Sequence, residues 1–261
     1  MINQTPLAPP TIKRMYDSTL LAAGYAFNRP PVHAQILAKV PFEHRVRRAL
    51  DIGCGAGLST AALLNRADFV VGIEPAEAML AHRRSVAQTA GFVVGMGERL
   101  PFADASFGLV TAAGSLNYVD LTVALAEVAR VLIDAGTFVI YDFSEGRHAR
   151  EGDALECWFA EFEQRFPWPP GYRPLVVPDM PFADFDLSLL SYERVEVPLA
   201  LTAEAYTRYV LSEVNVDAAL RRGDYTAAEA REWCESTLAA VFSSRLTVMF
   251  RGYVATVGKS R

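Results

Sequence analysis

The fold is predicted by the stretch Ala49-Leu50-Asp51-Ile52-Gly53-Cys54-Gly55-Ala56-Gly57. A hydrophobic strand runs into three glycines at alternate positions, and a helix is expected directly after them. Glycine permits backbone angles that other residues avoid, and it lets a ligand lie against bare main chain. Ligands of open parallel sheets bind at the carboxyl ends of the strands, which is where this turn lies. We therefore expect a ligand site at this turn.

Strand and helix signals alternate around this turn. Strands are expected at residues 48–52, 68–73, 92–95, 107–112 and 137–141. Helices are expected at 59–65, at 76–89 with Gly91 ending the helix, and from 121 with Asp120 as its cap. Helices between strands imply right-handed crossovers and a parallel sheet covered on both faces. The predicted fold class is α/β, with a doubly wound, seven-stranded, mostly parallel sheet of the Rossmann-like kind.

The rest of the chain lacks this alternation. Helices are expected on both sides of a break at Pro30-Pro31, at residues 151–166, from 202 to before Gly223, and from a capping box of Thr226 and Glu229. Strands are expected at 192–199 and 246–257. One domain in four parts follows: a helical cap at 1–40, the cofactor-binding core at 41–144, a substrate-covering insertion at 145–190, and the last part of the sheet with inserted helices at 191–261.

Composition excludes several classes of function. The 261 residues carry a formal net charge of −5, and nucleic-acid binding depends on neutralising phosphates, so a nucleic-acid partner is not expected. The three cysteines are widely spaced, which predicts neither a zinc site nor disulfides and fits the reducing cytoplasm. No uncharged stretch is long enough to span a membrane. We expect a soluble, cytoplasmic protein without a bound metal, and the sequence leaves its oligomeric state open.

A second acidic residue, Glu74, follows the glycine turn at the end of the next expected strand. Glu74 ends the second expected strand, and a carboxylate at that point accepts both hydroxyls of a ribose in dinucleotide-binding folds. The pair indicates an adenosine ligand. A dinucleotide fingerprint places its third glycine one position later than Gly57, and no Gly-Lys-Ser/Thr follows as a Walker loop requires. Asp51 before the first glycine suits a cationic ligand better than a diphosphate.

These residues closely resemble motif I of the class I S-adenosylmethionine-dependent methyltransferases. The resemblance extends from about residue 16 to residue 144, with Glu74 at the position of the family's ribose-binding acid. Residues 95–102 resemble the stretch G-D-A-E-x-L-P-F, and Asp134-Ala135-Gly136 stands in the turn before the fifth strand. The fourth strand has Gly108 where the family usually has Asp. The chain looks like the small-molecule branch called type 11, and residues 212–223 faintly resemble trans-aconitate methyltransferases.

The resemblance implies S-adenosylmethionine as cofactor and a small-molecule acceptor. It implies cofactor contacts from Tyr16, Asp51, Gly53, Cys54, Gly55, Gly57, Leu58, Glu74, Pro75, Met96, Gly97, Glu98 and Ser115. Met96 departs from the family, which usually has there an Asp that binds the adenine amino group. The N-P-P-Y motif of enzymes that methylate exocyclic or amide nitrogens is also absent. Base and glutamine-amide methylation are therefore not expected.

The acceptor side is predicted from aromatic and polar residues near the strand ends. Tyr25, Asn117, Trp168 and Tyr172 are expected to line the acceptor pocket, which we predict to be apolar or aromatic. Asn117 and His148 are candidates for catalysis, although an ordinary surface histidine is the favoured interpretation of His148. Phenylalanines 159, 162 and 166 have helical spacing and are expected to form the core of the cover instead.

Two other functions share these features. A nicotinamide-dependent oxidoreductase would use the same strand, glycine turn and ribose acid, although the glycine spacing and the later motifs favour the methyltransferase. A protein that binds S-adenosylmethionine without catalysis is also compatible with Met96. A comparison of the binding of S-adenosylhomocysteine, NAD and NADP distinguishes the methyltransferase from the oxidoreductase. A measurement of methyl transfer distinguishes it from a protein that only binds the cofactor.

Overall fold

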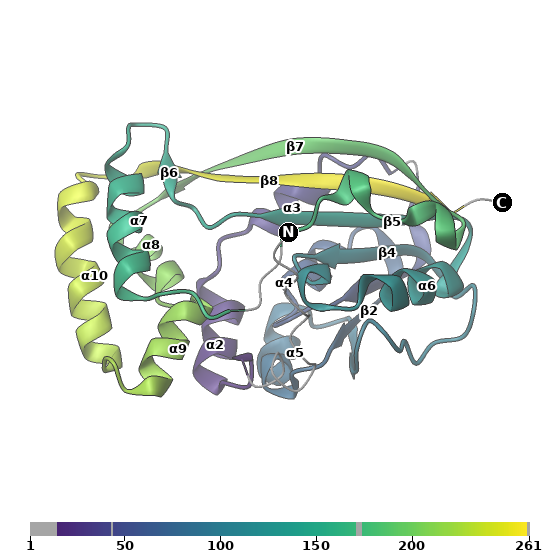
Figure 1. The fold of residues 1–261 in the computed structure, drawn as a ribbon, viewed down its shortest axis with the longest axis horizontal. Helices are drawn as coiled ribbons and strands as arrows, with labels where there is room; N and C mark the ends of the chain where they lie inside the picture. The colour runs from purple at the N-terminus through teal and green to yellow at the C-terminus, as the bar shows by residue number, and fades with distance from the viewer. Residues whose placement is uncertain (1–14, 43, 171–173, 260–261) are drawn as a thin grey trace.

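A single mixed sheet forms the backbone of the molecule (Figure 1). The computed structural model describes residues 15–42, 44–170 and 174–259. Within them the sheet has eight strands in the order β3-β2-β1-β4-β5-β8-β6, with β7 also paired to β8. Their bounds are β1 Val46–Ile52, β2 Ala67–Glu74, β3 Gly91–Val94, β4 Phe107–Ala113, β5 Leu132–Phe143, β6 His148–Ala149, β7 Leu187–Leu201 and β8 Leu246–Lys259.

The strand directions confirm the mostly parallel α/β sheet. Strands β1 to β5 pair in parallel, whereas β8 is antiparallel to both β5 and β7. The number of strands differs from the predicted seven. The additional strand is β6, whose two residues pair with Val248 and Met249. A segment of two residues has no periodicity that a sequence pattern can reveal.

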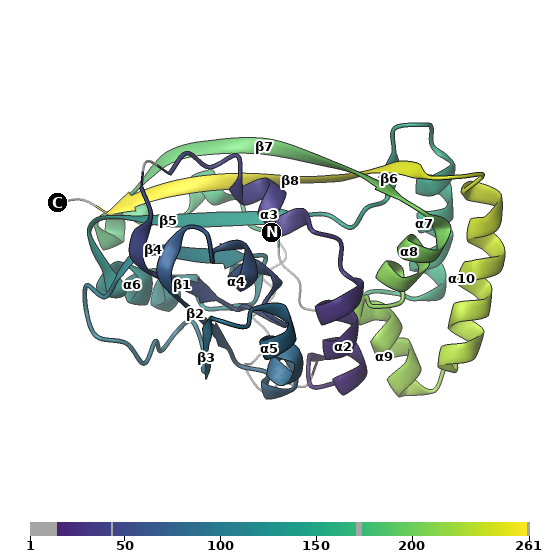
Figure 2. The same ribbon diagram turned by 180° about the vertical axis from the view of Figure 1, so that it is seen from behind.

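The helices lie in two groups. Those beside the sheet are α2 Thr19–Asn28, α3 Val32–Leu37, α4 Leu58–Ala62, α5 Arg83–Val86 and α6 Leu121–Val131, with the 3-10 helices η1 Glu77–His82, η2 Leu116–Tyr118, η3 Val177–Asp179 and η4 Phe182–Phe185. The others are α7 Ala154–Arg165, α8 Ala203–Val210, α9 Val214–Arg222 and α10 Ala227–Val241. This second group, here called the helical lobe, lies at one end of the molecule, and the long strands β7 and β8 reach it from the sheet (Figures 1 and 2).

Three predicted helix boundaries are confirmed. The chain leaves the helical conformation between α2 and α3 at Pro30 and Pro31. The Asp120 carboxylate accepts hydrogen bonds from the amides of Thr122 and Val123 at the start of α6. Thr226 and Glu229 form the capping box of α10. The residue types that cap helices therefore mark these boundaries correctly.

Two predicted helices are wrong in extent. Residues 76–89 form η1 and the single turn α5, and Gly91 begins β3 rather than ending a helix. In η1, Met79 is buried in a small cluster with Ala56 and Ala76, so tertiary packing outweighs local helix propensity. The helix expected from 202 to 222 is two helices, because the chain turns between Val210 and Val214. Glu213 lies in that turn and lines the cavity described below.

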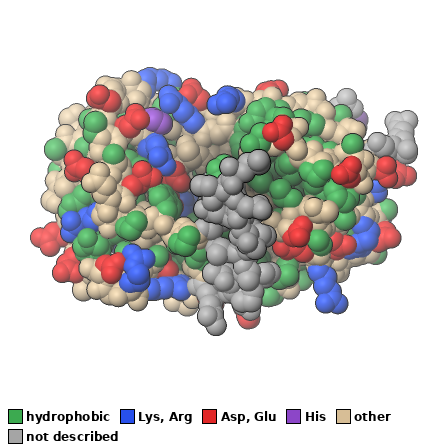
Figure 3. Space-filling model, viewed as in Figure 1, with side chains coloured by type: hydrophobic (Ala, Val, Ile, Leu, Met, Phe, Trp, Pro, Cys, Tyr) green, Lys and Arg blue, Asp and Glu red, His purple; other side chains and the backbone are tan. Residues whose placement is uncertain are grey.

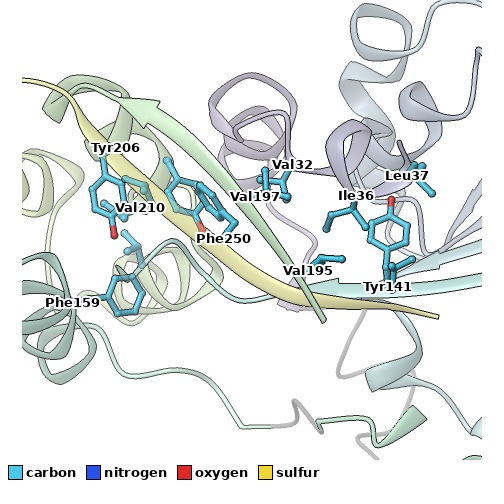
Figure 4. Close-up of a cluster of buried hydrophobic side chains, with 14 of the residues drawn as sticks. Val32, Ile36, Leu37, Tyr141, Phe159, Val195, Val197, Tyr206, Val210 and Phe250 are labelled. Atoms are coloured by element: carbon cyan, nitrogen blue, oxygen red, sulfur yellow. The ribbon is translucent and has the colours of Figure 1, made fainter. Parts of the chain in front are cut away.

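One continuous buried cluster joins the sheet to the helical lobe. Near the sheet, Tyr141 of β5 packs with Ile36 and Leu37 of α3 and with Val195 of β7 (Figure 4). Toward the lobe the cluster continues through Phe250 to Tyr206, Val210 and Phe159. Phe159, Phe162 and Phe166 are all almost fully buried, which confirms that they build the core of the cover.

Candidate functional site

The glycine turn lies between β1 and α4 and is fixed by bonds to its neighbours. Gly53, Gly55 and Gly57 all have positive φ angles of 66°, 53° and 97°. The amides of Gly53 and Cys54 both donate to the Ile73 carbonyl of β2, at 2.8 and 3.1 Å. From the other side, Ser115 Oγ donates to the Ile52 carbonyl at 2.6 Å. The turn is therefore held in place by both adjacent strands before any ligand binds.

Asp51 orders the base of this turn. Its fully buried carboxylate accepts hydrogen bonds from Ser59 and Thr60 of α4 at 2.6 and 2.7 Å and from Thr111 of β4 at 2.8 Å. Burial raises the pKa of Asp51, and the three hydroxyl groups oppose that shift. Asp51 does not line the cavity described below. Asp51 therefore orders the turn from behind, and its position gives no support to the direct cofactor contact predicted for it.

Glu74 faces the glycine turn from the end of β2. Its Oε2 accepts a hydrogen bond from the Gly55 amide at 3.0 Å, and its Oε1 accepts one from the Ala76 amide at 2.9 Å. Burial raises the pKa of Glu74, although the two amides act in the opposite direction. Each carboxylate oxygen has a second lone pair, so both can also accept a hydroxyl group of a ligand.

A cavity of about 940 Å³ opens in front of the turn. It is lined by thirteen of the predicted residues: Tyr16, Tyr25, Gly53, Cys54, Gly55, Leu58, Glu74, Pro75, Met96, Gly97, Glu98, Ser115 and Trp168. A Cβ built on Gly55 would meet Met79 Cε as its nearest atom, at 3.6 Å, so the main chain there borders open space. The cavity thus combines bare backbone, a buried carboxylate and the apolar side chains of Leu58, Met79 and Met96. This combination fits the nucleoside of the cofactor that the sequence implies.

Four predicted site residues lie elsewhere. Asp51 and Gly57 support the turn from behind, and Asn117 is buried in η2 outside the cavity lining. His148 lies in β6, where its Nδ1 is 3.0 Å from Glu156 Oε2 at the helical lobe. The positions of Asn117 and His148 therefore give no support to a catalytic role. Tyr172 lies outside the described residues.

The comparisons with known proteins agree with this geometry. Residues 50–140 match the family model described as a methyltransferase domain. This match runs from β1 to β5 and includes the glycine turn and Glu74.

Several curated proteins are similar to this chain over part of their length. The chain is 34% identical over 149 residues to the uncharacterized methyltransferase YcgJ of Bacillus subtilis, covering 54% of this chain and 55% of that protein. It is 38% identical over 100 residues to the demethylmenaquinone methyltransferase of Mycobacterium marinum, covering 37% of this chain and 42% of that protein. The chain thus spans about half the length of the curated relatives it matches.

Solved structures share the fold beyond the methyltransferase domain. The crystal structure of YcgJ from Bacillus subtilis has a TM-score of 0.53 at 22% identity, covering 88% of this chain and 99% of that one. The [4+2]-cyclase SpnF has a TM-score of 0.61 at 16% identity, covering 98% of both chains. This fold therefore also occurs in a protein described as a cyclase, so the fold alone does not identify the reaction.

The structure adds ion pairs that the sequence pattern did not predict. Arg29, at the end of α2, forms two hydrogen bonds of 2.8 Å with the Glu213 carboxylate and lies over the Tyr25 ring, 4.0 Å from its centroid. Arg147 lies 2.7 Å from Glu145 and 3.4 Å from Glu163. These residues line the cavity. Figure 3 shows acidic and basic side chains close to one another on the part of the surface over the helical lobe. The cavity-lining residues come from separate segments, and only the tertiary fold brings them together.

Among the described residues, no group of three or more His, Cys, Asp or Glu side chains is arranged to hold a metal ion. All three cysteines are free, and Cys54 and Cys234 are buried. No helix in the described part of the chain is both long and apolar enough to cross a membrane.

His33 of α3 also lines the cavity, and its burial makes the stability of the fold depend on pH. Its Nδ1 lies 3.1 Å from the hydroxyl of Tyr141, and its ring contacts those of Tyr141 and Phe143 edge to face. Burial, with a smaller effect of Arg29, lowers the pKa of His33 to about 4. His33 is therefore protonated near pH 6.5 in the unfolded chain but only near pH 4 in the folded chain. As the pH falls through this range, protonation of the unfolded chain lowers the free energy of unfolding.

We expect this histidine to cost about 2 kcal/mol of unfolding free energy between pH 7 and pH 5. Urea unfolding of the wild type and of His33→Gln at both pH values measures it, because the variant lacks the titrating group. The loss on acidification should be smaller in the variant by about that amount. An equal loss in both proteins would show that His33 is protonated in the folded state.

Proposed function

We propose that this chain is an S-adenosylmethionine-dependent methyltransferase that acts on a small-molecule acceptor. The observation that carries the proposal is the buried Glu74 carboxylate, which is bonded to the amide of Gly55 and lines a large cavity, within the residues that match a methyltransferase domain. Cavities of this size hold a cofactor together with a small substrate. The free cysteines agree with a reducing compartment, and we propose the cytoplasm.

The residues at the turn have separate roles in this proposal. Glu74 binds the ribose hydroxyls, and Gly53 and Gly55 leave space for the cofactor along the main chain. Leu58, Pro75 and Met79 pack against its apolar parts, while Met96, Gly97 and Glu98 border the adenine. Tyr16 of the N-terminal segment, whose hydroxyl donates to that of Tyr118 at 3.3 Å, covers the methionine end. Cys54 fills space within the turn.

The reaction would be an in-line displacement at a methyl carbon. The bound cofactor supplies a methyl group activated on a sulfonium sulfur, so the protein has mainly to position the acceptor. Alignment of two reactants alone contributes roughly 7–11 kcal/mol to such a step. Ser115 at the end of β4 and Asp142 at the end of β5 lie where the acceptor has to approach. A Cβ built on Gly114, next to Ser115, would be 2.8 Å from Asp142 Oδ1.

Ligand-dependent stability tests the choice of cofactor. S-adenosylhomocysteine at about 100 times its dissociation constant should stabilise the fold by about 2.7 kcal/mol, which is about 5 °C or more in melting temperature for a chain of this size. NAD and NADP should leave the melting temperature unchanged, because the turn lacks the glycine spacing for a diphosphate. If NAD or NADP raised the melting temperature and S-adenosylhomocysteine did not, the protein would be an oxidoreductase instead.

Catalysis needs its own measurement. Transfer of a labelled methyl group from S-adenosylmethionine to any compound of a metabolite extract distinguishes an enzyme from a protein that only binds the cofactor. Binding without transfer would leave cofactor binding in place and reject the proposed activity.

A further inference from the structure

The acceptor half of the cavity has more acidic than basic side chains among the described residues. This half is formed by side chains of α2 and α3, of the end of β5 and the segment after it, and of the helical lobe. Among the residues that the structure describes, the charged ones in this half are Arg29, Asp142, Glu145, Arg147, Glu163 and Glu213. His33 of the same half stays neutral near pH 7, since its pKa is lowered to about 4 by burial. Four carboxylates thus face two guanidinium groups.

Both guanidinium groups are already engaged by carboxylates. Arg29 forms a bidentate ion pair with Glu213, whose side chain is 4% exposed. Arg147 forms ion pairs with both Glu145 and Glu163. Glu163 is further fixed by the indole of Trp168, whose Nε1 donates to its Oε1 at 2.7 Å. The positive charges of both arginines are therefore balanced by neighbouring carboxylates, which leaves no net positive charge to attract an anion. An anionic acceptor would enter a space with an excess of two negative charges, and in a partly buried cavity that repulsion is weakly screened.

Two buried donors in this half indicate that the acceptor also carries an oxygen. The Nε atoms of Arg29 and Arg147 are buried and have no hydrogen-bond partner among the described residues. A buried donor without a partner is costly, so such groups usually meet a ligand or water. A hydroxyl or carbonyl oxygen satisfies them without adding negative charge.

From this arrangement we infer that the acceptor is an amine that also carries an uncharged oxygen and packs its apolar part against Trp168. The inference rests on the proposed function. The neutral amine, in equilibrium with its ammonium form in water, attacks with its nitrogen lone pair. A nitrogen–carbon bond forms, the sulfur–carbon bond breaks, and its electron pair stays on sulfur. The positive charge moves from sulfur to nitrogen, so the acidic lining faces one cation before and after the step.

The chemical class of the product tests the inference. The protein is incubated with a bacterial metabolite extract and methyl-deuterated S-adenosylmethionine, and compounds that gain the deuterated methyl group are found by mass spectrometry. They are then sorted by retention on cation and anion exchangers at pH 7, with cofactor-derived species excluded by mass. We expect the new product to be an amine retained by the cation exchanger. A product that is neutral or retained by the anion exchanger would overturn the inference while leaving the methyltransferase proposal intact.

Variants then test the residues. Glu163→Gln removes one charge from the acceptor half, and Glu161→Gln removes an exposed charge two residues away on α7. Glu163→Gln should raise the KM for the identified amine about tenfold without changing the affinity for S-adenosylhomocysteine, and Glu161→Gln should change neither. An unchanged KM in Glu163→Gln would reject the role of this charge. Failure of the wild type to bind S-adenosylhomocysteine, in contrast, would reject the proposed function itself.

Discussion

Replacement of Gly53 by alanine is expected to destabilise the protein by about 2–5 kcal/mol and to abolish cofactor binding. Gly53 has φ +66°, which costs other residues about 1–2 kcal/mol, and the new Cβ would lie 2.3 Å from the Cβ of Ser115. Overpacking of this kind typically adds 1–3 kcal/mol. Because the Gly53 amide is bonded to β2, the turn cannot move away without losing that bond. Urea unfolding and calorimetry with S-adenosylhomocysteine measure the two effects.

Two matched variants separate the backbone cost from the clash. Gly223 at the end of α9 has φ +79° and open space around it, so Gly223→Ala should lose only the backbone cost of about 1–2 kcal/mol. In the double variant Gly53→Ala/Ser115→Gly the clashing Cβ is gone, and part of the lost stability should return. If the single Gly53 variant were as stable as Gly223→Ala, close packing of the turn against β4 would not be what requires glycine there.

Replacement of Glu74 by alanine should weaken binding of S-adenosylhomocysteine by about a hundredfold or more. Hydrogen bonds to a charged group contribute about 1.5–3 kcal/mol each, and the carboxylate is placed to accept two ribose hydroxyls. Its removal also frees the Gly55 and Ala76 amides that it now orders. Calorimetry gives the dissociation constant directly.

Glu77→Ala is the matched control for Glu74→Ala, since Glu77 is an exposed acid three residues later, in η1. It should leave affinity within twofold of the wild type. Should Glu74→Ala bind as tightly as this control, the cofactor would have to be held elsewhere in the cavity, and the role of the second strand's acid would be lost.

The sequence predicts the cofactor half of the site well because local patterns determine it. The glycine spacing after β1, the acid ending β2 and the cap Asp120 each act through neighbouring backbone, so their residue types carry the information. Their positions on a parallel sheet then follow from the alternation of strands and helices. The cavity accordingly contains most of the residues predicted for this half.

The acceptor half depends instead on long-range packing. Arg29 and Glu213 are 184 residues apart, and no local pattern relates them. Glu213 reaches the cavity only because the predicted single helix from 202 to 222 is broken at this point. His148 was a candidate because it follows β5 in the chain, yet β6 directs it to Glu156. Which residues meet around the acceptor is decided by how the helical lobe packs, and this is not encoded in any short stretch.

The long pairing of β7 with β8 has a consequence for how this protein can diversify. The two strands stay paired from Leu187 and Lys259 to Leu201 and Leu246, so they extend from the edge of the sheet to the base of the helical lobe. The glycine turn lies on other strands and contributes nothing to this extension. Exchange of the helices that the two strands carry would therefore give a new acceptor specificity on an unaltered nucleoside platform, and a chimaera joined within β7 and β8 is the natural way to build one.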